Sequence, residues 1–145
     1  MNTPLLSVEN LSVTFNHQQT VVDNISFTIN AGETFALVGE SGSGKSITAL
    51  SVLRLLPNNA QIKAHAINLQ GDNLIKRAEF ELCKIRGKRI SLIFQDPMSS
   101  LNPVMTIGRQ IEEVLKIHFS LSRKDIKIRV LELLQQVEIP APSRD

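Results

Sequence analysis

The sequence predicts an α/β fold in which antiparallel strands come first, a glycine-rich loop follows a buried strand, and amphipathic helices close the chain. Apolar residues alternate loosely over residues 5–15 and 21–29, with the polar turn 16–19 between them, which predicts two paired strands. Residues 34–38 form a short, continuously apolar stretch, as expected for a parallel strand covered on both faces. The glycine-rich residues 39–46 come directly after it.

The middle of the chain is expected to add further strands and helices. A helix is predicted from Gly44 or Lys45 to Leu56, because Pro57 cannot continue it, and its apolar residues on more than one face indicate a buried helix. The other predicted elements are a strand over residues 64–69, a turn at Gly71-Asp72, a short helix over residues 78–85, a strand over residues 90–94 and a turn-rich stretch over residues 96–103.

Helical periodicity dominates the last part of the chain. Two amphipathic helices are predicted there, joined around residues 120–122, and Ser122 is expected to cap the second. Their apolar residues recur at helical spacing, at Ile107, Ile111, Val114 and Leu115 and then at Ile126, Val130, Leu133, Leu134 and Val137.

Composition excludes several classes of protein. The 145 residues suit one domain, and a net charge of +2 without any basic run gives no reason to expect a nucleic-acid partner. The most apolar stretch, residues 47–56, is about half of the roughly 20 residues that a membrane span needs. The first residues lack the pattern of a signal peptide. Cys83 is the only cysteine, so we expect a reducing, cytoplasmic compartment and a thiol that packs in the core.

One motif carries the chemistry. Gly39-Glu40-Ser41-Gly42-Ser43-Gly44-Lys45-Ser46 fits the phosphate-binding pattern G-x-x-x-x-G-K-[ST], with an apolar strand before it and a helix after it. The glycines let the backbone turn tightly and direct successive N–H groups to one point, where the positive end of the helix adds to the field. Lys45 can reach the outer phosphates and the Ser46 hydroxyl can hold Mg²⁺. This motif predicts a P-loop NTPase.

Two flanking residues are further candidates, each with a plainer alternative. Phe15 ends the first strand and could present its ring to a purine base, although a core phenylalanine is the other interpretation. Gln95 follows the predicted strand 90–94, and such strands end at the ligand crevice of α/β sheets. Its amide could orient a water molecule or touch a metal ion, or could simply begin a turn.

A longer string narrows the class. Phe94-Gln95-Asp96-Pro97-Met98-Ser99-Ser100-Leu101-Asn102-Pro103 resembles the Q-loop segment of ATP-binding-cassette (ABC) transporter ATPases, and in particular of the subfamily that powers oligopeptide, dipeptide and nickel importers. The P-loop together with the preceding Leu37-Val38 resembles the usual P-loop sequence of that subfamily, and residues 6–13 resemble its first strand. The resemblance implies a P-loop core with an N-terminal antiparallel β subdomain over residues 1–105, and the start of a helical subdomain over residues 106–145.

The resemblance also implies the site. Phe15 falls where the family stacks adenine. Gln95 falls on the Q-loop glutamine, which senses the γ-phosphate and Mg²⁺ and links to the membrane subunit. Lys45 and Gln95 are therefore the expected catalytic residues, and Ser46 and Gln95 the expected metal ligands. The expected nucleotide-binding residues are Phe15, Gly39, Glu40, Ser41, Gly42, Ser43, Gly44, Lys45, Ser46, Ile47 and Gln95.

The implied ligands are ATP and Mg²⁺, and the implied partners are transmembrane permease subunits and a second ATPase subunit or domain. The implied location is peripheral, on the cytoplasmic face of the inner membrane. Residues 64–67 lack the glycine that is usual in this strand-entry segment of the family.

Three later motifs of the family are absent from the sequence. There is no L-S-G-G-Q-like signature, no apolar strand ending in Asp-Glu, and no histidine at the switch position. Asp96 is a weak substitute for the missing metal ligand, because Gln95 separates it from the strand. The chain thus resembles the N-terminal part of a longer ATPase, expected to bind ATP without hydrolysing it and to leave residues 34–38 and 90–94 with exposed apolar flanks.

Two alternatives stay open. The chain could be a nucleotide-binding or interaction module that never hydrolyses ATP. It could instead be another P-loop enzyme such as a small kinase, although the string from Gln95 to Pro103 argues against this.

Overall fold

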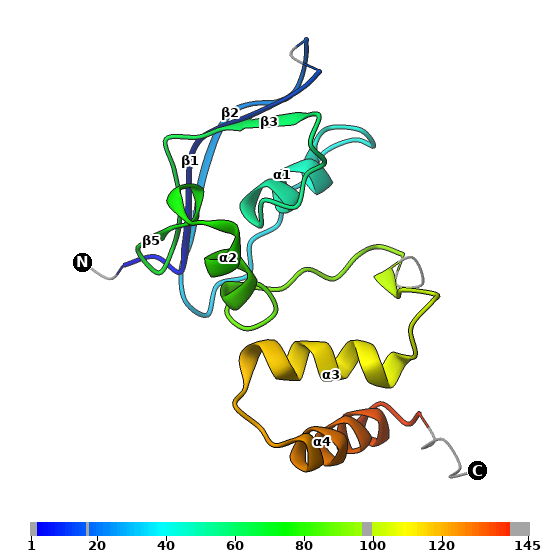
Figure 1. The fold of residues 1–145 in the computed structure, drawn as a ribbon. Coiled ribbons are helices and arrows are strands. Elements are labelled where there is room, and N and C mark those ends of the chain that lie inside the picture. Colours follow the sequence, from blue (N-terminus) through cyan, green and yellow to red (C-terminus); the bar gives the residue numbers. More distant parts are fainter. Residues whose placement is uncertain (1–2, 17, 97–99, 140–145) are drawn as a thin grey trace. The chain divides into compact units, whose positions relative to one another are not determined.

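Within residues 3–16, 18–96 and 100–139, which the computed structural model describes, a five-stranded antiparallel sheet forms the centre of the first of two units, Met1–Leu82. Strand β1 (Leu6–Phe15) pairs along one edge with β2 (Gln19–Ile29), as Figure 1 shows. Along its other edge β1 pairs with β3 (Ala60–Lys63) and with β4 (Ala66–Leu69). β1 is therefore the strand that holds the sheet together.

The alternation read from the sequence gives this sheet its buried face. Val8, Leu11 and Val13 of β1 are at most 1% exposed, and Ile67 of β4 is fully buried beside them. Helix α1 (Lys45–Val52) contacts β1 and β2 and buries Thr48, Ser51 and Val52. The two predicted N-terminal strands are confirmed, with bounds that differ from the expected ones by one or two residues.

The predicted end of α1 is wrong by one turn. The helix ends at Val52 rather than Leu56, because Arg54 adopts a left-handed conformation (φ 53°). The Leu55 amide donates to the Leu50 carbonyl at 2.9 Å, which is the bond that closes a Schellman-type helix end. Pro57 lies beyond the break, so it does not cause it.

The following segment holds two strands that the sequence did not predict, β3 and the two-residue strand β5 (Asp72–Asn73). β3 begins directly after Asn58-Asn59 and continues the pairing of β1 beyond β4. β4 is shorter than the predicted strand 64–69, because the chain crosses from β3 to β4 at residues 64–65. The turn expected at Gly71-Asp72 is centred one residue earlier, on Gln70 and Gly71, which both have positive φ.

β5 (Asp72–Asn73), the 3₁₀ turn η1 (Leu74–Lys76) and helix α2 (Glu79–Ile85) complete this part of the chain. The short helix predicted over residues 78–85 is confirmed. The expectation for Cys83 is wrong: the thiol is exposed, because Leu82 and Ile85 occupy the buried side of α2.

The two predicted parallel strands do not form. Residues 34–38 and 91–94 have no strand pairing among the described residues, and Ile90 makes only an isolated bridge to Arg86. An apolar sequence becomes a strand only where a neighbouring strand takes its N–H and C=O groups. The predicted exposure of these segments is confirmed: Val38 is 89% exposed and Ile93 92%, and Phe35, Leu37 and Phe94 are also exposed.

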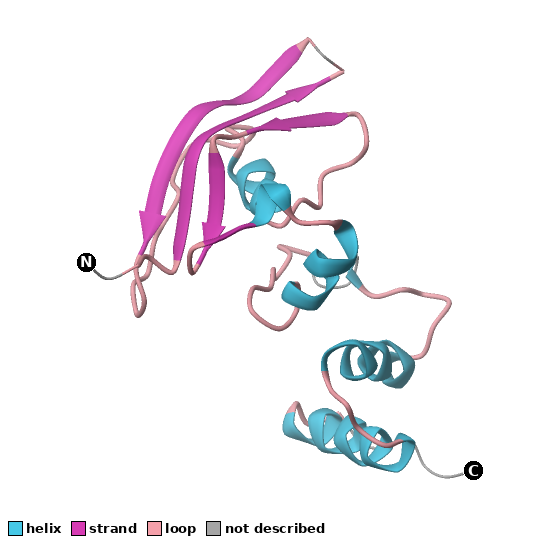
Figure 2. Ribbon diagram, turned by 60° about the vertical axis from the view of Figure 1, so that its left-hand side comes forward, coloured by secondary structure: helices cyan, strands magenta, loops and turns pink. Residues whose placement is uncertain are grey.

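Helices α3 (Ile107–His118) and α4 (Arg123–Gln136) belong to the second unit, Cys83–Asp145 (Figure 2). They confirm the two helices that the spacing of the apolar residues predicts. They share a small core of Leu115, Ile126, Val130 and Leu134, with Ile111 packed against it. Ser122 caps α4 as predicted, since its hydroxyl accepts the Asp125 amide at 3.2 Å. In the described part of the chain no helix has the length and apolar character to cross a bilayer.

We expect the exposed apolar stretches to drive self-association, because unpaired strand-like segments of high β-propensity template one another. A Val38→Thr/Ile93→Thr double variant should therefore aggregate more slowly than the parent chain, by about threefold or more in the rate of light-scattering increase at equal concentration. Val104→Thr is the matched control, since Val104 is also 87% exposed but lies outside both stretches. Equal rates for all three proteins would contradict this origin of association.

Candidate nucleotide-binding site

The glycine-rich loop lies directly before α1, at the end of the helix that faces β2. Residues 39–43 are exposed, and the chain enters the helix at Lys45. Gly42 and Gly44 both adopt positive φ, 82° and 88°, which L side chains rarely reach. The turn closes with the Ser43 amide donating to the Glu40 carbonyl at 3.2 Å. The loop thus curves back toward its own start.

Gly44 is the point at which this loop is fixed to the sheet. A Cβ added there would lie 2.9 Å from the Val21 carbonyl oxygen and 3.1 Å from Cγ2 of Val22. Only glycine allows the start of α1 to approach β2 this closely, so two constraints, conformation and space, act on the same residue. The sequence motif predicts a glycine here, but the contact with β2 is visible only in the structure.

The first turn of α1 leaves donors for an anion. The first intrahelical bond runs from the Thr48 amide to the Gly44 carbonyl at 2.8 Å. By the geometry of an α-helix, the amides of Lys45, Ser46 and Ile47 have no acceptor within the helix, and Gly44 supplies no side-chain cap. Three converging N–H groups at the positive end of a helix form a site that suits phosphate oxygens.

Lys45 brings its charge into the same loop. Its Nζ donates to the carbonyls of Gly39 and Glu40, both at 2.7 Å, and to Oγ of Ser43 at 3.2 Å. The loop therefore holds the ammonium group inside its own curve, within reach of any anion that the helix amides bind. Loop and lysine together fit the polyphosphate tail of a nucleotide.

A metal ion would depend on Ser46 and on the bound phosphates. Ser46 is the second residue of α1 and its side chain is exposed. No cluster of three His, Cys, Asp or Glu side chains occurs among the residues that the structure describes. A single serine hydroxyl would suit a divalent cation that keeps several water ligands and takes others from substrate phosphates.

Phe15 lies on the sheet face that carries the loop. It ends β1, is half-buried, and pairs with Gln19 and Ala60. Val13 shares its face of the strand and pairs with Val22, the residue that borders Gly44. The fold thus brings the predicted base-stacking residue and the P-loop to the same face of one hairpin.

Gln95 belongs to the second unit and is exposed there, on a bend rather than at the end of a strand. Its share in the site stays a prediction. Pro97, Met98 and Ser99 of the same string lie outside the described residues. The division of the chain after residue 105 likewise stays a prediction.

Sequence reasoning missed Gln110, which fixes the end of the Q-loop string. Its amide nitrogen donates to the carbonyls of Asn102 and Met105, each at 3.1 Å, and its oxygen accepts the Asn102 amide at 3.0 Å. The signal available in the sequence was a glutamine in the first turn of a predicted helix that begins after a proline-containing turn. Gln110 thereby ties residues 102–105 to α3.

Comparison with known sequences decides the family. The family described as ABC transporter matches residues 22–144, which is most of the chain and includes the P-loop and the Q-loop string. The chain belongs to the ABC transporter family. The fold of this ABC protein, an antiparallel β sheet packed on the P-loop helix and followed by helices, is the predicted α/β class.

Relatives of this ABC protein include proteins that are named for transport. The oligopeptide transport ATP-binding protein AppD of Bacillus subtilis is 48% identical over 137 residues, covering 92% of this chain and 42% of AppD. OppD of the same organism, also an oligopeptide transport ATP-binding protein, is 42% identical over 98% of this chain and 41% of its own length. The uncharacterized ABC transporter ATP-binding protein YejF of Escherichia coli is 48% identical over 96% of this chain and 27% of its own. The chain thus spans less than half the length of these curated relatives.

The contact of Gly44 with β2 predicts a separable stability effect. Gly44→Ala should lower the free energy of unfolding by about 1–2 kcal/mol for the left-handed backbone and by about 1–3 kcal/mol more for the clash with the Val21 carbonyl. Gly32→Ala is the matched control, because Gly32 also has positive φ (76°) but meets no heavy atom within 4 Å. Denaturant titration followed by circular dichroism measures both. Equal losses would mean that the close approach contributes nothing.

Proposed function

We propose that this chain binds MgATP on its P-loop, as the nucleotide-binding part of an ATP-binding subunit that powers peptide import. The observation that carries the proposal is the convergence of the α1 amides and Lys45 at a loop fixed by Gly44. The relatives named for oligopeptide transport support the substrate class. Peptide selection itself belongs to the partner proteins in this proposal.

Different residues of the loop have different roles in this proposal. The amides of the first α1 turn and of the preceding loop residues, Glu40, Ser41 and Ser43 included, receive the phosphate oxygens, and Gly39 and Gly42 allow the loop its curvature. Lys45 exchanges its carbonyl acceptors for the oxygens of the outer phosphates, where its charge is compensated. The Ser46 hydroxyl would hold Mg²⁺ beside the bound phosphates, and the ion would supply positive charge at those oxygens. Gln95 is proposed as a second metal ligand from the sequence resemblance alone.

Hydrolysis requires groups beyond those in these 145 residues. Lys45 and Gln95 are the catalytic residues that we assign to this chain, and the signature motif, the metal-binding and catalytic carboxylates and the switch histidine of the family have no counterpart in its sequence. Phosphoryl transfer needs metal, water and charge stabilisation positioned together. We therefore expect this chain to bind ATP with no measurable turnover.

The remaining partners follow from the same assignment. A second ATPase subunit or domain would face the P-loop, and the helices from α3 onward would dock on permease subunits. The location that goes with this proposal is peripheral, on the cytoplasmic face of the inner membrane. Exposed apolar residues on both helices, Val114 and Ile117 on α3 and Ile128 on α4, are suited to such docking.

Replacing the P-loop lysine tests the proposal directly. Lys45→Ala should weaken ATP binding by about tenfold to a hundredfold, because charge-assisted hydrogen bonds to phosphate are lost. Isothermal titration calorimetry in excess Mg²⁺ measures the dissociation constant. A phosphate-release assay on the same samples should give no turnover for the parent chain.

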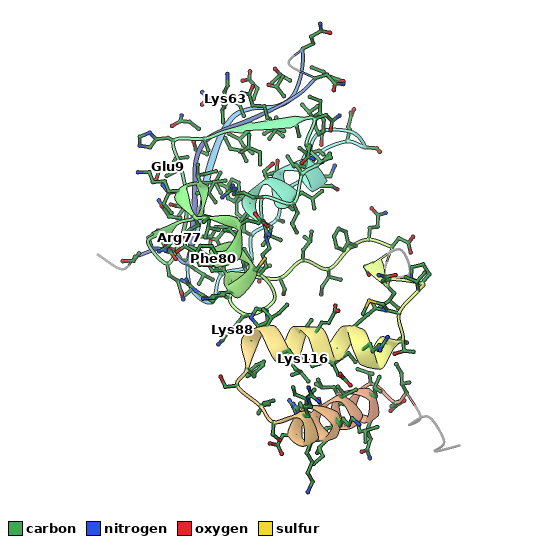
Figure 3. All side chains as sticks on the ribbon, viewed as in Figure 1. Glu9, Lys63, Arg77, Phe80, Lys88 and Lys116 are labelled. Carbon is green, nitrogen blue, oxygen red and sulfur yellow. The ribbon has the colours of Figure 1, made fainter. Side chains whose placement is uncertain are left out.

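Lys63→Ala is the matched control, since Lys63 is an exposed lysine at the end of β3 (Figure 3). It should bind ATP as the parent chain does. Equal binding by the Lys45→Ala and Lys63→Ala proteins would contradict the proposal. Transfer of phosphate to a small acceptor would instead identify another class of P-loop enzyme.

Phe15 offers a test of the base site. Phe15→Leu keeps an apolar side chain but removes the ring, so ATP binding should weaken by about tenfold through lost stacking. Binding of inorganic tripolyphosphate should change by less than about twofold, because the phosphate contacts remain. Competition against a fluorescent ATP analogue measures both ligands.

Phe80→Leu on α2 serves as the control, since Phe80 is 66% exposed (Figure 3). If Phe15 is only a core residue, the Phe15→Leu protein will bind ATP as tightly as this control does. That result would remove the base-stacking role.

A further inference from the structure

The end of the P-loop helix is held by an arginine in a glycine-like conformation. Arg54 follows the last turn of α1 with φ 53°, and its amide donates to the Ser51 carbonyl at 3.0 Å. Helices that end in this way most often use glycine here, because a Cβ is disfavoured in the left-handed region. Arginine at this position therefore carries a backbone cost that glycine would not.

The guanidinium of Arg54 bonds to backbone far away in the sequence. Its Nη1 donates to the Arg77 carbonyl at 2.6 Å and to the Leu74 carbonyl at 3.3 Å. These carbonyls lie at the beginning of η1 and just after its end, directly before α2. Bonds from a charged donor to partly buried carbonyls are stronger than neutral ones. Arg54 thus joins the end of α1 to the η1–α2 segment.

A second set of hydrogen bonds holds the η1–α2 segment together. Arg77 lies between η1 and α2 (Figure 3) and donates to Asp72 of β5 at 2.6 and 2.9 Å and to Glu81 of α2 at 2.7 Å. Glu81 also accepts the Ala78 amide at 3.0 Å. The bonds from Ala78 and Arg77 lower the pKa of Glu81, because both donate to its ionised carboxylate. These bonds connect β5, η1 and α2 to one another without Arg54.

We propose that Arg54 is a positioning residue that makes the η1–α2 segment respond to nucleotide bound at the opposite end of α1. The proposal rests on the proposed function for its nucleotide. α1 has only eight residues, so its two ends move together. Phosphate held by the first turn restrains the helix, and Arg54 passes that restraint to residues 74–82 through two hydrogen bonds. The chain leaves α2 at Ile85 and reaches Gln95 ten residues later.

Arg54→Gly separates the role of the side chain from that of the backbone, because glycine keeps the left-handed helix end and removes the whole side chain with its guanidinium. Hydrogen–deuterium exchange of the 145-residue protein without nucleotide reports the bridge itself. Amides in residues 74–82 should exchange about tenfold faster in the variant, while those of α1 stay within about twofold of the parent. Gln70→Gly is the matched control, as Gln70 also has positive φ (52°), and should leave residues 74–82 unchanged.

Adding MgATP tests the response. In the parent chain and in the Gln70→Gly control, nucleotide should slow exchange in α1 and in residues 74–82. In the Arg54→Gly protein it should slow exchange in α1 alone, with ATP affinity within about threefold of the parent. Protection of residues 74–82 that survives in the variant would overturn the inference, and so would unchanged exchange without nucleotide. A parent chain that binds no ATP would overturn the proposed function, while the nucleotide-free comparison would still decide whether Arg54 holds the segment.

Discussion

The close approach of Gly44 to the Val21 carbonyl is the constraint on which the site depends. It sets the start of α1 against β2, and β2 is held in turn by the long pairing with β1. The amides of the first helical turn and the lysine that follows Gly44 are positioned by the same contact. A larger residue at position 44 would displace the helix from the sheet, and with it every donor that could meet a phosphate.

The loop is organised by its own hydrogen bonds. The ammonium group of Lys45 donates hydrogen bonds to two loop carbonyls and a serine hydroxyl, so its charge lies near the helix amides without a bound ligand. A preorganised cation loses less conformational entropy when it meets an anion than a freely rotating one does. The same bonds are the ones that a phosphate must replace, so affinity is a difference between two well-bonded states.

An apolar segment does not always form a strand in this chain. Residues 6–15 and 34–38 are both apolar enough for strands, but only the first find backbone partners on both sides. Residues 34–38 and 91–94 stay irregular and expose large side chains such as Val38 and Ile93. Burial of apolar surface cannot compensate for unpaired backbone groups, so a strand is a property of its neighbours as much as of its residues.

The sequence by itself determined the elements whose signals are local. The alternation of residues 6–15, the G-x-x-x-x-G-K-[ST] spacing, the periodicity of α3 and α4 and the Ser122 cap all depend on near neighbours, which periodicity and capping rules describe. The resemblance to ABC ATPases rests on such strings as well, and the match over residues 22–144 agrees with it. Tertiary structure decided what depends on distant partners. Examples are the strand β3, the early end of α1 at Arg54, the exposed thiol of Cys83 and the irregular course of residues 34–38. β3 pairs with the distant strand β1, and Arg54 bonds to the carbonyls of Leu74 and Arg77. Residues 34–38 find no strand partner among the described residues, and the side of α2 that is buried leaves Cys83 exposed.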